Sequence, residues 1–352
     1  MTDANILKKP NTLLALGFGL FFIFTTIVNI FFDNQEIIKM QSVYIILYLQ
    51  NILAFIIFYY FFDRISLDFF LKLFLLIIVL SVFRIFIEEP NHIFSFSTIK
   101  GERIEAYFIS GVNNFAIFIG VALIISFFYI KKRFLKLILC LFWLLVITLT
   151  LSRGALLGVI VTLFAVAFYD TDRKTLKALT KFTIFLLLVG VFAIFYFDKV
   201  EVLVEQFNDR FLSFFTGEKS IETFSSGRID VWGNMIERIG NSNFSQILFG
   251  HGVGSINFVI LGELDFESSH NVFIDLAYRN GIIVCILYLM MVVHLFWLFI
   301  KNRNRNKLTL FGIFFFIHLE LMVNPMLFAA QTGWIYAMML VMFIKQNKLT
   351  SE

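Results

Sequence analysis

Ten long apolar segments follow one another along this 352-residue chain, and they limit its fold more than any other feature does. About 20 consecutive apolar residues cross a bilayer as one helix, and continuous rather than alternating segments favour helices over a β-barrel. Charged residues make up only 15% of the chain, well below the roughly 25% of soluble domains. We therefore expect an all-α membrane protein with about ten transmembrane helices. They are expected near residues 12–31, 43–62, 67–87, 111–130, 135–151, 154–169, 178–197, 270–300, 308–323 and 326–344.

The charges between these segments predict the orientation of the chain. Basic residues gather in every second loop, as they do in cytoplasmic loops. These residues are Arg64, Lys131, Lys132, Arg133, Lys136, Arg173, Lys174, Lys177, Lys301, Arg303, Arg305, Lys307, Lys345 and Lys348. The longest outward loop carries eleven Asp or Glu against five Lys or Arg. Both termini are therefore expected in the cytoplasm, with helices one to seven in 1–197, a large outer loop in 198–269, and helices eight to ten and a tail in 270–352.

The large outer loop is predicted to hold short helices. Apolar residues recur at helical spacing from Val200 to Phe215, which indicates an amphipathic helix lying on the membrane. Residues Ile229 to Ile239 indicate a second short helix. The glycine-rich sequence from Phe249 to Gly254 predicts a turn-rich segment, in which His251 is expected to be structural.

Several arginines are expected on the outer side, where the orientation rule gives them no role. They are Arg103, Arg153, Arg210, Arg228 and Arg279. The planar guanidinium fork suits bidentate binding of phosphate, so together they predict a cationic pocket for a lipid pyrophosphate. The alternative is that individual arginines reach lipid headgroups or pair with acidic residues elsewhere.

His270 opens the segment that leads into the long helix 270–300, with Ser268 or Ser269 as a possible cap. At roughly 1.5 Å per residue this helix exceeds the hydrocarbon thickness, so its first turns should project above the bilayer. A helix N-terminus favours the neutral form of a nearby histidine, which a general base needs. A histidine at a helix start can also be purely structural, and both interpretations remain open.

Neither a metal nor a cofactor is indicated by the motifs. No His-x-Glu, cysteine pair or paired aspartate pattern occurs in an outward loop, and Gly250-x-Gly252-x-Gly254 lacks the preceding strand of a dinucleotide site. A transporter is an alternative of another class, because polar groups in a helical bundle also mark substrate pathways.

Four motifs, in this order, resemble the O-antigen polymerase and ligase superfamily over about residues 100 to 344. They are Gly101-Glu102-Arg103 with Gly111-Val112-Asn113-Asn114; Leu151-Ser152-Arg153-Gly154-Ala155-Leu156-Leu157-Gly158; Ser226-Gly227-Arg228 with Trp232 and Phe249-Gly250-His251-Gly252-Val253-Gly254; and His270-Asn271 with Gly281. Arg279-Asn280, just before Gly281, departs from the expected pattern by its basic residue.

The resemblance implies a class C glycosyltransferase-like fold in the bacterial inner membrane, and an inverting, metal-independent glycosyl transfer at its periplasmic face. It implies His270 as the catalytic residue that activates or positions an acceptor hydroxyl. The implied substrate-binding residues are Arg103, Asn113, Arg153, Arg210, Arg228, Asn271 and Arg279. Expected partners are undecaprenyl-pyrophosphate-linked oligosaccharides and membrane lipids, with a chain-length regulator as a further candidate; no cofactor and no nucleic acid is expected.

The leading hypothesis is a polymerase of O-antigen or capsule repeat units. The alternative within the superfamily is a ligase that transfers the finished glycan to lipid A-core, and the alternative outside it is a transporter of polysaccharide or lipid-linked oligosaccharide. The modest length and the 49 phenylalanines favour the polymerase, because each polymerase matches its own glycan. The motifs do not separate polymerase from ligase.

Overall fold

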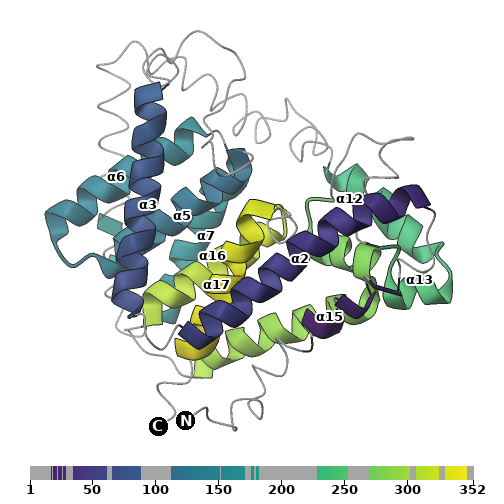
Figure 1. Cartoon of the computed structure of the whole chain (residues 1–352). Coiled ribbons are helices and arrows are strands. Elements are labelled where there is room, and N and C mark those ends of the chain that lie inside the picture. The colour runs from purple at the N-terminus through teal and green to yellow at the C-terminus, as the bar shows by residue number, and fades with distance from the viewer. Residues whose placement is uncertain are drawn as a thin grey trace. The chain divides into compact units, whose positions relative to one another are not determined.

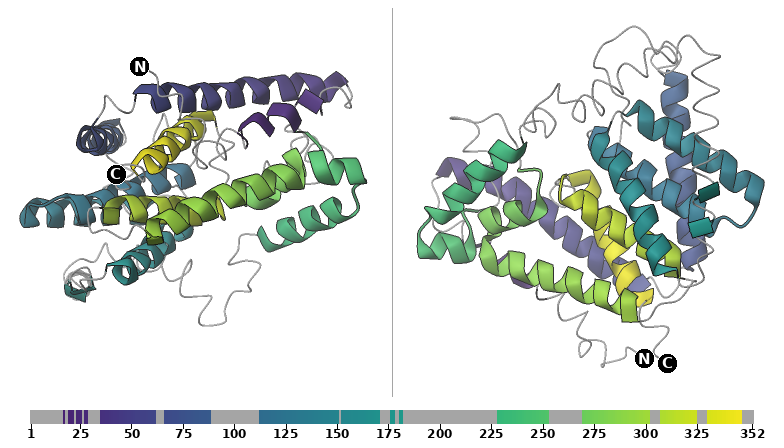
Figure 2. Two further views of the ribbon diagram at one scale, coloured as in Figure 1. Left: turned by 90° about the horizontal axis from the view of Figure 1, so that it is seen from below. Right: turned by 180° about the vertical axis from the view of Figure 1, so that it is seen from behind.

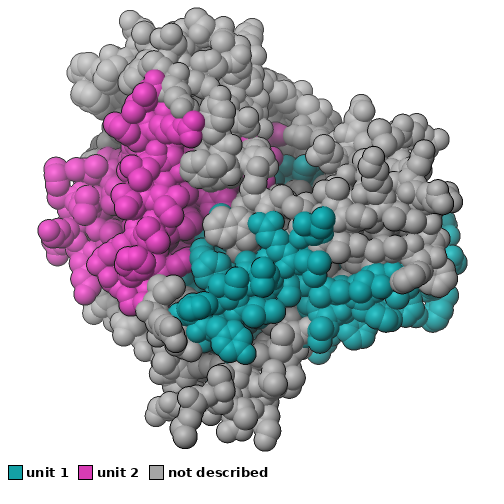
Figure 3. All heavy atoms as spheres, viewed as in Figure 1, with its two compact units in different colours: residues 1–65, 227–302, 321–352 teal, residues 66–226, 303–320 magenta. Residues whose placement is uncertain are grey.

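In the computed structural model, the described residues form helices joined by short turns (Figure 1). These residues are 35–61, 66–88, 112–150, 152–170, 228–252, 269–301, 307–324 and 330–346, with isolated positions between 17 and 28 and between 176 and 181. The chain divides into two compact units (Figure 3). Unit 1 comprises residues 1–65, 227–302 and 321–352, and unit 2 comprises residues 66–226 and 303–320.

Unit 1 is organised around a long helix, α15 (Val272–Lys301). Its other helices are α2 (Gln35–Phe61), α12 (Arg228–Gly240), α13 (Phe244–Phe249) and α17 (Ala330–Gln346). Helices α12 and α13 pack against α15, near its N-terminal end, and α2 packs along α17 (Figure 2). The buried hydroxyls of Tyr288 and Tyr336, 3.1 Å apart, connect α15 to α17. Polar contacts as well as apolar packing therefore hold this unit together.

Unit 2 has helix α5 (Val112–Tyr129) at its centre, with an uninterrupted buried stretch from Phe115 to Phe127. Around it pack α3 (Leu67–Glu88), α6 (Arg133–Leu149) and α7 (Arg153–Tyr169). Helix α16 (Leu308–Leu321) packs here too, with the Phe316 ring against Gly120 and the Glu320 carboxylate beside Gly158. Both glycines are places where a β-carbon would collide with α16, so they permit its close approach.

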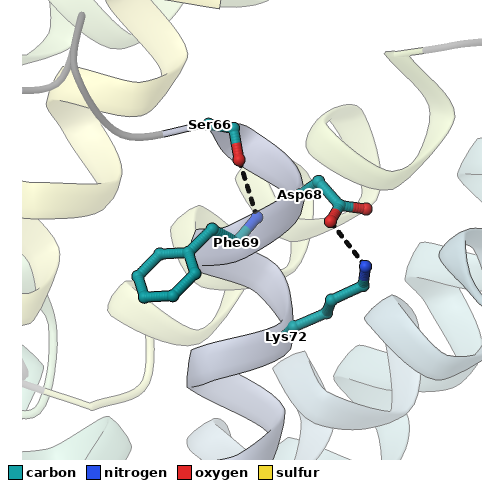
Figure 4. A network of polar contacts seen from close by, with 4 residues as sticks. All are labelled: Ser66, Asp68, Phe69 and Lys72. Atoms are coloured by element: carbon teal, nitrogen blue, oxygen red, sulfur yellow. Dashed lines mark hydrogen bonds and ion pairs between the residues drawn. The ribbon is translucent and has the colours of Figure 1, made fainter.

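The start of α3 shows how local sequence sets a helix boundary in unit 2 (Figure 4). The backbone N–H of Phe69 donates to the Ser66 hydroxyl at 3.1 Å, which satisfies one of the free donors of the first turn. Asp68 and Lys72, four residues apart, form an ion pair at 2.6 Å. Both side chains are exposed, so this ion pair adds little stability.

Three of the described helices are long and apolar enough to cross a membrane: Leu67–Ile87, Val112–Tyr129 and Val272–Lys301. Shorter apolar helices occur at Leu49–Phe61, Arg153–Tyr169, Leu308–Leu321 and Ile335–Lys345. Helices therefore occur at eight of the ten expected segments, within a few residues at most ends. The segment 178–197 and the amphipathic stretch 200–215 lie outside the described residues apart from Thr180 and Lys181, and 12–31 is described at isolated positions only. The total of ten spans and the orientation stay predictions.

The second expected helix of the outer loop, 229–239, is present as α12. The break within 135–169 is present as well, but it falls slightly earlier than expected. Helix α6 ends at Leu149, and Arg153 is already the first residue of α7. Arg153 therefore stands at a helix N-terminus in unit 2.

Candidate functional site

The turn before α15 contains the catalytic candidate, and its cap differs from the one expected. Asn271, rather than Ser268 or Ser269, caps the helix: its Oδ1 accepts the N–H groups of Phe273 at 3.0 Å and Ile274 at 3.3 Å. The Ser269 hydroxyl accepts the Asn271 N–H at 3.1 Å and donates to the Asn271 carbonyl at 3.0 Å. An amide side chain is as good a cap as a hydroxyl, and here the serine supports the cap instead.

His270 lies between these two anchored residues in an uncommon backbone conformation. Its φ is 57°, the one positive value among the described residues other than glycine. Left-handed conformations are unfavourable for residues with a β-carbon, and they concentrate where surrounding contacts enforce them, often at functional sites. The half-buried side chain of His270 is therefore placed by the conformation of the turn.

The backbone on both sides of Ser269 is held by side chains from two helices. The Trp232 indole of α12 donates to the Ser269 carbonyl at 2.7 Å, and the Ser269 N–H donates to Asp275 Oδ1 of α15 at 2.9 Å. Arg228 lies four residues before Trp232, a separation that places two side chains on the same face of a helix. The structure thus connects the helix that begins at Arg228 to the His270-Asn271 turn within unit 1.

Helix α15 is kinked at Gly281, whose φ of 83° and ψ of 167° are not helical. The glycine-rich turn packs into this kink: Gly250, also with positive φ, lies against the backbone of Arg279 and Asn280, and Gly281 lies against the backbone of Leu248. The N–H groups of His251 and Gly252 donate to the carbonyls of Tyr278 and Arg279 at 2.8 and 2.9 Å. Carbonyls that precede a helix break need such replacement partners.

His251 has the structural environment that the sequence predicted for it. Its ring stacks on Tyr278 with centroids 4.4 Å apart, and its Nε2 lies 2.7 Å from the Ser242 hydroxyl. Burial lowers the pKa of His251 below its usual value of 6.5, so the neutral ring is favoured. The Arg238 guanidinium lies near the Tyr278 hydroxyl. These contacts fix the turn and the first half of α15 relative to each other.

Arg279 is an interior residue of unit 1. It is 2% exposed, and Asp275, one helical turn earlier, is fully buried. Two buried ionisable side chains on one helix face are costly unless they are paired or hydrogen-bonded. Neighbouring Asn280 is also buried, and its amide donates to the Thr25 hydroxyl at 3.1 Å. The structure therefore surrounds Arg279 with protein, whereas Arg228 is only half-buried.

Unit 2 brings two other predicted residues to one end of its helices. Asn113 lies in the first turn of α5 and Arg153 begins α7. The Ser152 hydroxyl donates to Asn113 Oδ1 at 3.4 Å, so the N-terminal ends of α5 and α7 lie together. Helix N-termini attract anions, and an arginine there adds a full positive charge.

The predicted residues thus fall into two described groups. Arg228, His270, Asn271 and Arg279 belong to unit 1, and Asn113 and Arg153 to unit 2; Arg103 and Arg210 lie outside the described residues. Among the described residues there is no cluster of three or more His, Cys, Asp or Glu side chains that could hold a metal ion. Asp275 was not among the site residues predicted from the sequence. An acidic residue inside the apolar segment after His270 could have indicated it, because ionisable residues in such segments often mark functional sites.

Comparison with protein families finds a match over residues 137–289 to the O-antigen ligase family. The matched range covers most of α6, all of α7, α12 and α13, and the first part of α15, and so includes Arg153, Arg228 and His270. The resemblance to the O-antigen polymerase and ligase superfamily is confirmed. Comparison with curated proteins found no match.

Proposed function

We propose that this membrane protein, with its O-antigen ligase-type region at 137–289, polymerises undecaprenyl-pyrophosphate-linked oligosaccharide repeat units at the periplasmic face of the bacterial inner membrane. The observation that carries the proposal is the hydrogen bond from Trp232 to the Ser269 carbonyl. It brings the helix that carries Arg228 next to the turn that carries His270. The candidate phosphate-binding Arg228 and the candidate base His270 then lie on two segments that a hydrogen bond holds together.

The chemistry is a displacement at the anomeric carbon of the donor. The acceptor hydroxyl oxygen forms the new bond to this carbon, and the bond from carbon to the pyrophosphate oxygen breaks on the opposite face, which inverts the configuration. The leaving lipid pyrophosphate takes the bonding electrons, and the fixed positive charge of Arg228 stabilises the charge that develops there. His270 accepts the proton of the attacking hydroxyl.

These two roles divide the reaction between leaving group and nucleophile. A pyrophosphate is already a good leaving group, so fixed cations and a base suffice, and we propose that no metal takes part. Asn271 is a substrate-binding candidate because it directly follows His270. Arg279 is a candidate on the same helix, α15, where its side chain is buried. Arg153 and Asn113 are separate candidates in unit 2, where they would bind phosphate or sugar hydroxyls.

A ligase is the second candidate, because the matched family is described as O-antigen ligase. Purified protein in proteoliposomes separates the possibilities when it is given lipid-linked repeat units, with or without lipid A-core. A ladder of longer lipid-linked chains supports the polymerase, and glycan attached to lipid A-core supports the ligase. Unchanged chain length with movement of glycan across the bilayer would contradict both and indicate a transporter. A chelator should leave the rate unchanged.

The orientation can be tested on its own with reporter tags. Tags after Lys136, Thr175 and Asn304 should report the cytoplasm, and a tag near Lys219 the periplasm. A cytoplasmic signal near Lys219 would contradict the proposed side of the reaction.

A further inference from the structure

We propose that Asp275 and Trp232 are positioning residues that together hold His270 in its working orientation; this rests on the proposed function, in which His270 takes the proton of the acceptor. The carbonyl that Trp232 binds belongs to the peptide bond joining Ser269 to His270. The Ser269 N–H, on the other side of the same residue, is bound by Asp275. The backbone leading into His270 is thus held from two helices.

The burial of Asp275 argues that its carboxylate has a specific task. It is fully buried near the start of a largely apolar helix, where a carboxylate is unfavourable without compensating hydrogen bonds. Its Oδ1 accepts a buried backbone N–H that would otherwise need another acceptor. Asp275 therefore anchors the turn to the body of α15, as Trp232 anchors it to α12.

The strained conformation of His270 explains why two anchors are needed. With φ at 57° the residue would tend to relax to an ordinary conformation. On its other side, Asn271 is fixed as the helix cap. With both neighbours held, His270 cannot relax, and its imidazole keeps one direction. Loss of either anchor on Ser269 would let the turn relax and move the ring away from the acceptor hydroxyl.

Three variants test this with turnover. Trp232→Phe keeps the ring and removes the donor; Asp275→Ala removes the acceptor; Asp275→Asn keeps an oxygen acceptor for the Ser269 N–H. The first two should lower kcat by about 100-fold, as displacement of a catalytic group by about 1 Å does, with little change in the KM for donor. Asp275→Asn should retain far more activity than Asp275→Ala.

Trp143→Phe is the matched control, because Trp143 donates a similar bond of 2.9 Å to the Ser126 hydroxyl inside unit 2. It should stay close to the wild type. The positioning role is wrong if Trp232→Phe turns over normally, if it raises the KM for donor without lowering kcat, or if Asp275→Asn is as inactive as Asp275→Ala.

A measurement without turnover keeps this test separate from the proposed function. The chain has five histidines, and in protein labelled with ¹⁵N in the imidazole rings the His270 signals can be assigned by their loss in His270→Gln. Trp232→Phe and Asp275→Ala should shift these signals, while Trp143→Phe should not. Unshifted His270 signals in both variants would overturn the proposal. If the His270 signals shift in both variants but the wild-type protein shows no chain growth, the proposed function alone is contradicted.

Discussion

Helix α15 begins directly after His270 and Asn271, and helix α7 begins at Arg153, but the two units hold these residues differently. In unit 1, the start of α15 is held by directed hydrogen bonds: the Asn271 cap, the Trp232 and Asp275 anchors, and the glycine-rich turn in the kink. In unit 2, Ser152 makes no side-chain cap for α7 and turns to Asn113 instead. Much of the packing in this unit is apolar, with the Phe316 ring of α16 against Gly120.

This difference predicts how well each unit should tolerate amino-acid substitutions. A hydrogen bond weakens steeply when its angle falls below about 120°, and at a separation of about 3.6 Å it is no longer a hydrogen bond. Packed side chains can adjust by changing rotamers, at a moderate cost. Unit 1 should therefore respond sharply to substitutions near His270, and unit 2 more gradually to substitutions in its interior.

The largest effect is expected for the arginines, one from each unit. Arg153→Ala and Arg228→Ala should each abolish chain growth while leaving the protein in the membrane, because a pyrophosphate loses its fixed cation. Lysine should rescue poorly, since an ammonium does not reproduce the planar fork. Arg133→Ala is the matched control, because Arg133 begins α6 as Arg153 begins α7 but is exposed. The glycan ladder on a gel measures all of these variants.

The lysine variants also test whether the two arginines contribute in the same way. If Arg153→Lys were active and Arg228→Lys were not, unit 2 would contribute charge alone while unit 1 would bind phosphate through two hydrogen bonds. Normal activity of both lysine variants would contradict bidentate binding in either unit.

His270 comes next in expected effect. His270→Ala should lower the rate by about 10²–10⁴-fold, as loss of a general base does, with donor binding little changed. His270→Gln can still hydrogen-bond the acceptor but cannot take its proton. Turnover and binding of labelled lipid-linked donor should be measured in parallel. A nearly active glutamine variant would show that His270 only positions the acceptor, and lost donor binding in both variants would place it among the pyrophosphate contacts.

Two glycines compare the units by stability. In Gly281→Ala the positive φ alone should cost about 1–3 kcal/mol, and the new β-carbon also meets the Leu248 backbone. In Gly120→Ala the β-carbon meets the Phe316 ring, which can shift, so about 1–3 kcal/mol in total is expected. Exposed Gly233 of α12 has open space around it, and Gly233→Ala should stabilise by about 0.5–1 kcal/mol. Thermal unfolding in detergent ranks the stability of the three variants. Equal losses of stability in Gly281→Ala and Gly120→Ala would contradict the expected difference between the two units.

The smallest effect concerns pH and unit 1. Because burial lowers the pKa of His251 in the folded turn, the unfolded form binds a proton more readily. The turn should therefore have its full stability above the ordinary pKa of 6.5 and lose stability as the pH falls from there to the lowered pKa. The thermal midpoint of the wild type should therefore decrease as the pH is lowered through this range. His251→Gln should flatten this dependence, and an unchanged slope in that variant would assign it to other groups.

Much of the helical framework was predictable, because the apolar length of a segment is a local property. The bounds of α3, α5, α7 and α16 lie within two residues of the segments expected from apolar length alone. The glycine-rich turn and α12 were also expected, since glycine clusters and helical spacing are read within a few residues. The Asn271 cap was missed because serine and asparagine are equally good caps and the choice depends on where the chain turns.

The sequence alone predicts most of the described helices and indicates which residues could bind phosphate or take a proton. Contacts between distant segments establish which of these residues meet. The bond from Trp232 to the Ser269 carbonyl joins residues 37 positions apart, and the bond from Ser152 to Asn113 joins residues 39 positions apart. The kink at Gly281 likewise occurs where the turn at 250–252 binds the freed carbonyls of α15. Burial of a helix in a bilayer depends on the composition of one segment, so it can be predicted locally. These hydrogen bonds instead require two groups from distant segments to meet within about 3 Å in the right direction.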